Sequence, residues 1–212
     1  MTHNTLLHLG SCTLVNIIST YKRILFLYIL CQVSLQRWNG FHFSHFCGGS
    51  IVASEWVVTA AHCCEGRRPI GIKVVAGGVS LQQDEGVEQT RFARLVIIHE
   101  RYGQPVPEEN DICMIKLRNP FVLTENVNEV ILPRRWEEVP SGSMVTVTGW
   151  GRVRDDDSPL SDILEKVSVP VVSDRKCKKE YEFVTEIARS MLCAGFDDGG
   201  KDSCQEIQED RW

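Results

Sequence analysis

Apolar and polar residues alternate in a series of short runs along the first two thirds of this chain. A side-chain period of two is typical of β-strands that bury one face. The pattern predicts strands at residues 32–36, 49–53, 56–59, 72–76, 92–98 and 113–117. Single and paired glycines separate these runs, as tight turns require. Many short strands joined by glycine-rich turns favour an antiparallel barrel over a parallel sheet.

The last third of the chain repeats this pattern after residues 125–140, which have the composition of a linker. Strands are predicted at residues 145–151 and 164–172. Ser173 is a suitable N-cap for a short helix that runs to Tyr181. The chain has 212 residues, and an all-β barrel domain of about 200–250 residues is common. The sequence therefore predicts one all-β domain.

The first 31 residues do not share the strand pattern. Residues 14–30 are mostly apolar, but Asn16, Lys22 and Arg23 interrupt them. A signal peptide places its basic residues before the apolar core and small residues at the cleavage site. A membrane span needs about 20 predominantly apolar residues, and two basic residues fall inside this one. A degenerate signal and an anchor both stay open, but we expect neither, and we expect no membrane partner.

Charge and cysteine content restrict the class of protein. The formal net charge is −5 and there is no long basic run, which argues against nucleic acid as a partner. Nine cysteines are many for a cytosolic chain and indicate an oxidising compartment. Because the number is odd, at least one thiol has no intramolecular partner.

A histidine follows the strand predicted at residues 56–59. Two alanines let the backbone turn tightly, and His62 and Cys63 come next. A histidine held rigidly at a strand end is suited to proton transfer, which depends on fixed geometry. The sequence Thr-Ala-Ala-His-Cys at residues 59–63 resembles the catalytic-histidine motif of trypsin-like serine proteases.

Further motifs follow in the order that this family has. They are Asn-Asp-Ile at 110–112, Gly-Trp-Gly at 149–151 and Lys-Asp-Ser-Cys-Gln at 201–205. The chain is identified as a member of the trypsin-like serine proteases over residues 32–205. The resemblance implies two antiparallel six-stranded barrels, the second of them incomplete. Residues 1–31 and 206–212 would lie outside the family domain.

The resemblance gives roles to three residues. His62 would act as the general base and Asp111 would orient its imidazole. Asp202 would lie at the base of the primary pocket, where a buried carboxylate attracts Arg or Lys of the substrate. The simpler interpretations are a core or surface histidine, a helix cap or surface acid, and a solvated loop acid, respectively. The implied protein is a secreted, monomeric endopeptidase that cleaves protein substrates after Arg or Lys.

The nucleophilic serine of the mechanism is absent from its expected place. In the family, the motif ending at Gln205 continues as Gly-Asp-Ser-Gly-Gly, whereas here Glu206, Ile207 and Gln208 follow. Gln208 occupies the position of the nucleophile, so we expect the chain as written to be inactive. The chain would then be an incomplete or alternatively spliced copy of an active protease. The alternatives are a catalytically dead homologue that acts as a binding module, and a protein anchored through residues 14–30.

The resemblance also implies two disulfides. Cys63 would bond to Cys47, and Cys177 to Cys193. Cys113 is expected to pack as a small apolar residue in its strand, and Cys64 has no evident partner.

No cofactor is expected from the sequence. Adjacent side chains such as those of His62 and Cys63 diverge, so they do not form a metal site. Some trypsin relatives bind calcium in the loop that aligns with residues 78–88. Glu85 and Glu88 match that loop, but Gly78 replaces a carboxylate. Because calcium requires several oxygen ligands, a solvated acidic turn is the alternative.

Overall fold

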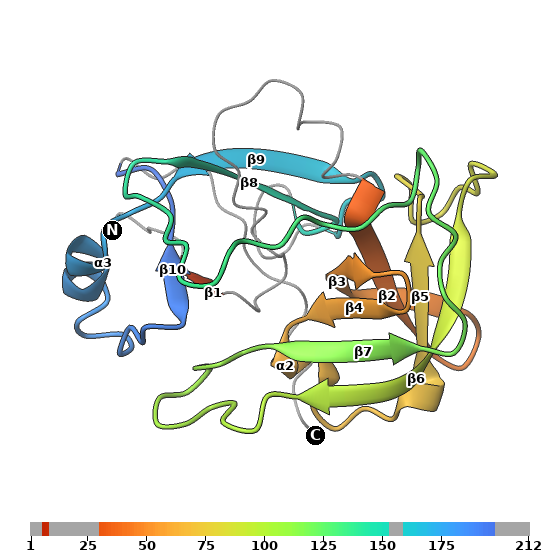
Figure 1. The fold of residues 1–212 in the computed structure, drawn as a ribbon, viewed down its shortest axis with the longest axis horizontal. Helices are drawn as coiled ribbons and strands as arrows, with labels where there is room; N and C mark the ends of the chain where they lie inside the picture. The colour runs from red at the N-terminus through yellow and green to blue at the C-terminus, as the bar shows by residue number, and fades with distance from the viewer. Residues whose placement is uncertain (1–5, 9–29, 153–158, 198–212) are drawn as a thin grey trace.

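Six strands of the computed structural model, which describes residues 6–8, 30–152 and 159–197, form a closed antiparallel barrel (Figure 1). The order around the barrel is β2-β3-β4-β7-β6-β5. The strands are β2 (Gln32–Trp38), β3 (Phe43–Ala53), β4 (Trp56–Thr59), β5 (Ile72–Ala76), β6 (Gln89–Ile98) and β7 (Cys113–Leu117). The predicted all-β class and the first barrel are thereby confirmed.

The alternation of side chains fills the interior of this barrel. In β5, residues Ile72, Val74 and Ala76 are buried while the residues between them are only half-buried. The same alternation occurs in β7 around Ile115, which is fully buried. Strands β3 and β6 begin earlier than predicted. β3 starts at Phe43 because Trp38 pairs with it across the β2–β3 hairpin, so the hairpin extends beyond the apolar run.

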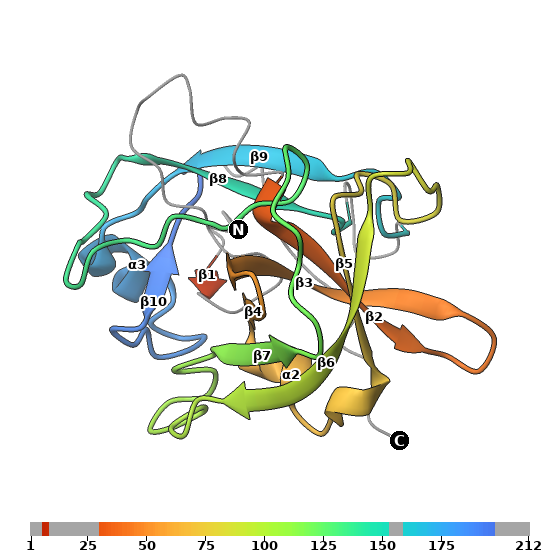
Figure 2. The ribbon, with the colours of Figure 1, turned by 45° about the vertical axis from the view of Figure 1, so that its right-hand side comes forward.

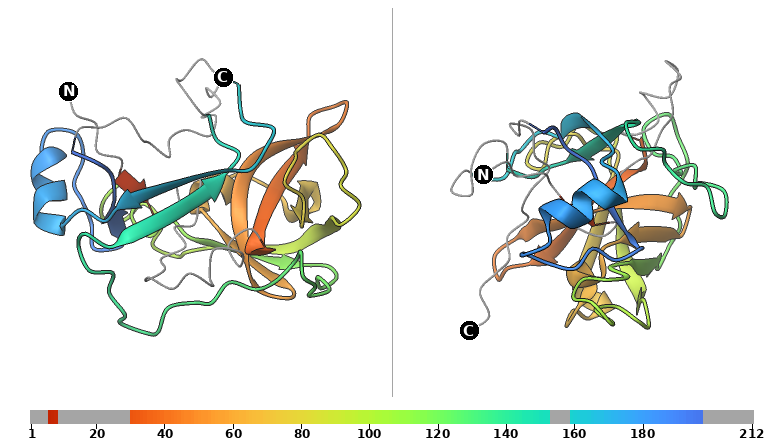
Figure 3. Two further views of the ribbon diagram at one scale, coloured as in Figure 1. Left: turned by 90° about the horizontal axis from the view of Figure 1, so that it is seen from above. Right: turned by 90° about the vertical axis from the view of Figure 1, so that its left-hand side faces the viewer.

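The described part of the second half contains two smaller sheets. Strand β8 (Met144–Gly149) pairs with β9 (Glu165–Pro170), and β10 (Met191–Cys193) pairs with β1 (Leu6–His8). The sequence did not predict β1. Figure 3 shows that the β8–β9 ladder extends from the barrel towards α3 (Asp174–Glu180) at the far end of the molecule. The described part of the second half is therefore a partial second sheet, consistent with the incomplete second barrel that the resemblance implied.

Specific hydrogen bonds join the two halves. The indole of Trp150, in the Gly-Trp-Gly motif, is buried and donates to the carbonyl oxygen of Val79 at 2.8 Å. Thr148 donates to the side-chain oxygen of Gln32, a buried residue of β2, at 3.2 Å. In the second half, the hydroxyl of Ser173 accepts a hydrogen bond from the backbone N–H of Lys176, as expected for the N-cap of α3.

Within the described segments, the structure contains no helix with the length and apolar character needed to cross a bilayer.

Candidate active site

His62 lies on α2 (Ala61–Cys64), a single turn that follows β4 directly (Figure 2). Ala60 keeps an extended backbone, and both Ala60 and Ala61 are buried, so their small side chains let the turn pack closely against the barrel. The hydroxyl of Thr59 donates to the carbonyl oxygen of Gly48 at 2.7 Å, which fixes the end of β4 against β3. His62 is the residue of this turn that reaches the surface, with a side chain 37% exposed.

Asp111 lies at the end of the connection between β6 and β7. The preceding residue, Asn110, has a positive φ of 55°, a conformation that asparagine adopts more readily than most residues. The backbone N–H of Asn110 donates to the hydroxyl of Ser190 in the second half at 3.2 Å. This turn directs the Asp111 carboxylate inwards, and its side chain is only 3% exposed.

The structure brings His62 and Asp111 together. Nδ1 of His62 lies 2.7 Å from Oδ2 of Asp111, and the backbone N–H of His62 donates to Oδ1 of the same carboxylate at 2.9 Å. An ionised carboxylate accepts hydrogen bonds but cannot donate them, so this contact assigns the proton to Nδ1. In the neutral imidazole, Nε2 then holds the lone pair. Such an arrangement is suited to a general base whose second nitrogen faces a substrate.

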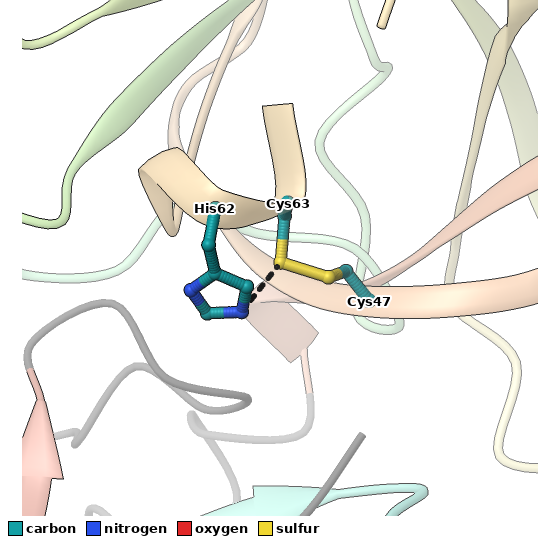
Figure 4. A group of neighbouring side chains, drawn as sticks. All are labelled: Cys47, His62 and Cys63. Carbon is teal, nitrogen blue, oxygen red and sulfur yellow. Dashed lines mark hydrogen bonds between the residues drawn. A yellow bond between two sulfur atoms is a disulfide. The ribbon is translucent and has the colours of Figure 1, made fainter. Parts of the chain in front are cut away.

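A disulfide lies beside the imidazole. Figure 4 shows His62 and Cys63 projecting from α2, with Cys47 of β3 bonded to Cys63. Nε2 of His62 is 3.4 Å from Sγ of Cys63. One ligand atom from each of these three residues lies within 4.8 Å of the others. The two sulfurs are bonded to each other, however, and only a thiolate is a good metal ligand, so this cluster does not have the chemistry of a metal site.

One expectation about the cysteines was wrong. Cys64 and Cys113 form a disulfide with a Cα–Cα distance of 6.6 Å, so Cys113 is not a merely apolar strand residue. The cause is the pairing of β4 with β7, which places Thr59 opposite Cys113. The turn of α2 then brings Cys64 back to that strand. The two disulfides implied by the resemblance, Cys47–Cys63 and Cys177–Cys193, are also present.

The loop of residues 78–88 closes on its own backbone. Both carboxylate oxygens of Glu88 accept backbone N–H groups, one from Glu85 at 2.8 Å and one from Val87 at 3.0 Å. Glu85 in turn accepts the N–H of Val79 at 3.1 Å. Only two of the expected carboxylates are present, because Gly78 replaces the third, and both already satisfy loop N–H groups. These residues do not fit the six to eight oxygen ligands that calcium prefers.

Asp202 and Gln208 lie outside the described residues. By resemblance, the first is the expected residue at the base of the primary pocket and the second stands at the expected position of the nucleophile. Sequence reasoning also missed two contributors to the site, Ser190 and the Cys64–Cys113 bond. The hydroxyl of Ser190 left no signal in the sequence. The disulfide did leave one, since each cysteine follows a candidate catalytic residue by two positions.

Comparison with known proteins agrees with the geometry. The family model described as Trypsin matches residues 28–205. This chain belongs to the trypsin family. It is 39% identical over 178 residues to Trypsin-1 of Astacus astacus, an overlap of 82% of this chain and 73% of that protein.

Two vertebrate relatives show similar sequence identity and coverage. The chain is 40% identical over 162 residues to Trypsin of Sus scrofa, covering 76% of this chain and 66% of that protein. It is 40% identical over 174 residues to Trypsin-3 of Salmo salar, covering 82% and 67%. The chain thus spans about two thirds to three quarters of the length of these relatives.

Proposed function

We propose that this trypsin-family chain carries the histidine–aspartate part of the catalytic machinery of a serine endopeptidase acting on protein substrates. The 2.7 Å contact between Nδ1 of His62 and Oδ2 of Asp111 is the observation that carries the proposal. In the mechanism worked out for this family, a serine hydroxyl attacks the scissile carbonyl while histidine takes its proton and later returns it to the leaving amine. Aspartate holds the imidazole in the correct tautomer.

The burial of the two partners supports these roles. The Asp111 side chain is almost completely buried whereas that of His62 is 37% exposed, so the carboxylate is screened from water while the imidazole can meet a substrate. The second bond to the carboxylate, from the His62 backbone N–H, orients both oxygens. Asp111 would therefore stabilise the imidazolium that forms during proton transfer.

We infer specificity for Arg or Lys from the motif around Asp202. In trypsin-like relatives, an aspartate at this place lies at the base of the primary pocket. A carboxylate that is removed from water requires a cationic partner, and guanidinium and ammonium groups provide charge-assisted hydrogen bonds. The three disulfides among the described residues support action in an oxidising compartment such as the extracellular space.

The identities of residues 206–208 suggest that the chain as printed does not turn over substrate. Gln208 stands where the nucleophilic serine is expected, and Glu206 stands where a glycine would donate to the oxyanion hole. Losing the nucleophile of a catalytic triad reduces turnover about a million-fold. The same observation favours a second candidate function, in which the chain binds a protein without cleaving it.

A hydrolysis assay tests the proposal. The full chain and its His62→Ala variant are incubated with peptide amides that carry Arg, Lys or Leu before the scissile bond. We expect no difference between the two proteins. Cleavage after Arg or Lys that the variant lacks would overturn the inactivity while supporting the dyad and its specificity. Cleavage after Leu that depends on His62 would overturn the specificity.

The pocket is tested separately with p-aminobenzamidine, a fluorescent mimic of the arginine side chain. If Asp202 recognises cationic side chains, Asp202→Asn weakens binding at least tenfold, and Asp198→Asn serves as the matched control. Equal affinity of the wild type and both variants would overturn the assignment of Asp202.

A further inference from the structure

The Cys64–Cys113 disulfide links the same two segments of the chain as the candidate catalytic pair. Cys64 follows His62 by two residues, Cys113 follows Asp111 by two residues, and each pair spans 49 residues of sequence. We propose that this disulfide positions the catalytic dyad by fastening the turn that carries His62 to the strand that follows Asp111. The inference deepens the proposed function and rests on it for its catalytic meaning.

The turn that carries His62 has little stability of its own. α2 contains four residues, and no side chain caps its N-terminus. Helices much shorter than about 12 residues do not persist in water without tertiary contacts. Two covalent bonds instead hold α2 at consecutive residues, because Cys63 is bonded to β3 and Cys64 to β7. The second of these bonds leads directly to the Asp111 side of the site.

The segment before Asp111 also needs an anchor. Residues 99–112 connect β6 to β7 without a helix or strand of their own, and Ile112 is 38% exposed. Cys113, in contrast, is buried and is the first residue of β7, where it pairs with Thr59 of β4 and Ile98 of β6. The disulfide therefore joins α2 to the rigid point next to Asp111.

Burial places the bond on the core side of the site. Cys64 and Cys113 are each 1% exposed, whereas the His62 side chain is partly open to solvent. The bond thus limits how far α2 can move from β7 while the imidazole remains accessible. Restraint of this kind matters because a displacement of about 1 Å in a catalytic group can cost about 100-fold in rate.

Amide exchange in the full chain tests the proposal, because the backbone N–H of His62 donates to Asp111 and so reports the joined state. We compare the wild type with Cys64→Ala/Cys113→Ala. The matched control is Cys177→Ala/Cys193→Ala, which removes a disulfide of the second half. We expect exchange at His62 to accelerate at least tenfold in the first variant relative to barrel amides such as that of Ile115, and to be unchanged in the control.

Exchange at His62 that stays within twofold of the wild type, in a folded Cys64→Ala/Cys113→Ala variant, would overturn the proposal. If that variant does not fold, exchange is measured in the wild type at increasing urea below the unfolding transition. The proposal requires the His62 amide to open only together with the amides of β4 and β7. A urea-independent local opening at His62, with the disulfide intact, would overturn it.

The outcome is independent of the hydrolysis assay. Exchange at a backbone amide does not require a nucleophile or a substrate, so an inactive chain with a protected His62 amide bears on the proposed function alone. Exchange at His62 that accelerates in Cys64→Ala/Cys113→Ala relative to the wild type bears on the disulfide alone.

Discussion

The two halves of the molecule differ in how completely their strands are paired. The first is a closed six-stranded barrel with one core cluster of 17 buried residues. The described part of the second has two sheets of two strands each, with two clusters of five buried residues. His62 and Asp111 both come from the first half. The difference teaches that both residues of the candidate dyad come from the closed barrel, while the second half supports the turn before Asp111 through the hydroxyl of Ser190.

The largest expected effect is the loss of a core side chain from the barrel. Ile115→Ala removes a fully buried residue of β7 and should lower the free energy of unfolding by about 3 kcal/mol. Ile187→Ala, at a site 6% exposed in a small cluster of the second half, should cost less because that cluster can relax. Ile131→Ala, at an 80% exposed site, should change the free energy of unfolding by less than about 0.5 kcal/mol.

Urea denaturation followed by tryptophan fluorescence measures all three variants. If Ile187→Ala lowers the free energy of unfolding as much as Ile115→Ala or more, the result would contradict the view that the core of the first half is more completely packed than that of the second.

Removal of the Cys177–Cys193 bond should act on the second half only. The bond closes a loop with a sequence separation of 16, and the chain-entropy model assigns such a loop about 3 kcal/mol. In Cys177→Ala/Cys193→Ala we expect faster amide exchange in α3 and β10 and unchanged exchange in β4 and β7. Equal acceleration in both regions would show that the two halves form one cooperative unit.

Alkaline pH should weaken the barrel through Cys31, which directly precedes β2. Burial raises the pKa of the Cys31 thiol to about 11 from an ordinary value of 9.0, although a backbone hydrogen bond and one to Ser50 act in the opposite direction. The stability that this shift contributes is complete below pH 9.0 and is lost as pH rises to about 11. At about 1.4 kcal/mol per pKa unit, the loss is roughly 3 kcal/mol.

The measurement is the free energy of unfolding at several pH values for the wild type and Cys31→Ala. Subtracting the two curves removes the titration of other groups. A difference that is flat between pH 9 and pH 11 would show that Cys31 is not held as a buried neutral thiol.

The smallest expected effect is that of calcium on residues 78–88. Because Glu85 and Glu88 already accept N–H groups of this loop, millimolar calcium should raise the melting temperature by less than about 1 °C, as expected when binding to the native state is negligible. Glu88→Gln serves as the control. A calcium-dependent rise of several degrees that Glu88→Gln abolishes would establish a site in this loop.

Local patterns in the sequence were sufficient to predict the first barrel and to identify the two residues of the candidate dyad. The alternation of residues 72–76 predicted β5 because its period of two directly reports a buried face. His62 and Asp111 were found because each lies within a short motif. The proximity of the two residues could not come from either motif alone, since it requires the pairing of β4 with β7.

Long-range contacts account for what the sequence did not reveal. Cys64 and Cys113 are 49 residues apart, and only their matching positions, two residues after His62 and two after Asp111, connect them in the sequence. Strand β1 also pairs with a segment from the opposite end of the chain, which periodicity over three residues cannot predict. Such contacts depend on how the strands are arranged in space, and that arrangement is set by the whole barrel.

The most direct test of the account is the tautomer of His62 in the folded chain, read from nitrogen-15 correlations of selectively labelled histidine near pH 8. A dyad built by the barrel predicts that Nδ1 carries the proton and Nε2 is unprotonated, and that Asp111→Ala removes this preference. Protonation at Nε2 with a bare Nδ1 in the wild type would contradict the hydrogen bond to Asp111, and with it the central claim that the closed barrel brings the candidate catalytic pair together.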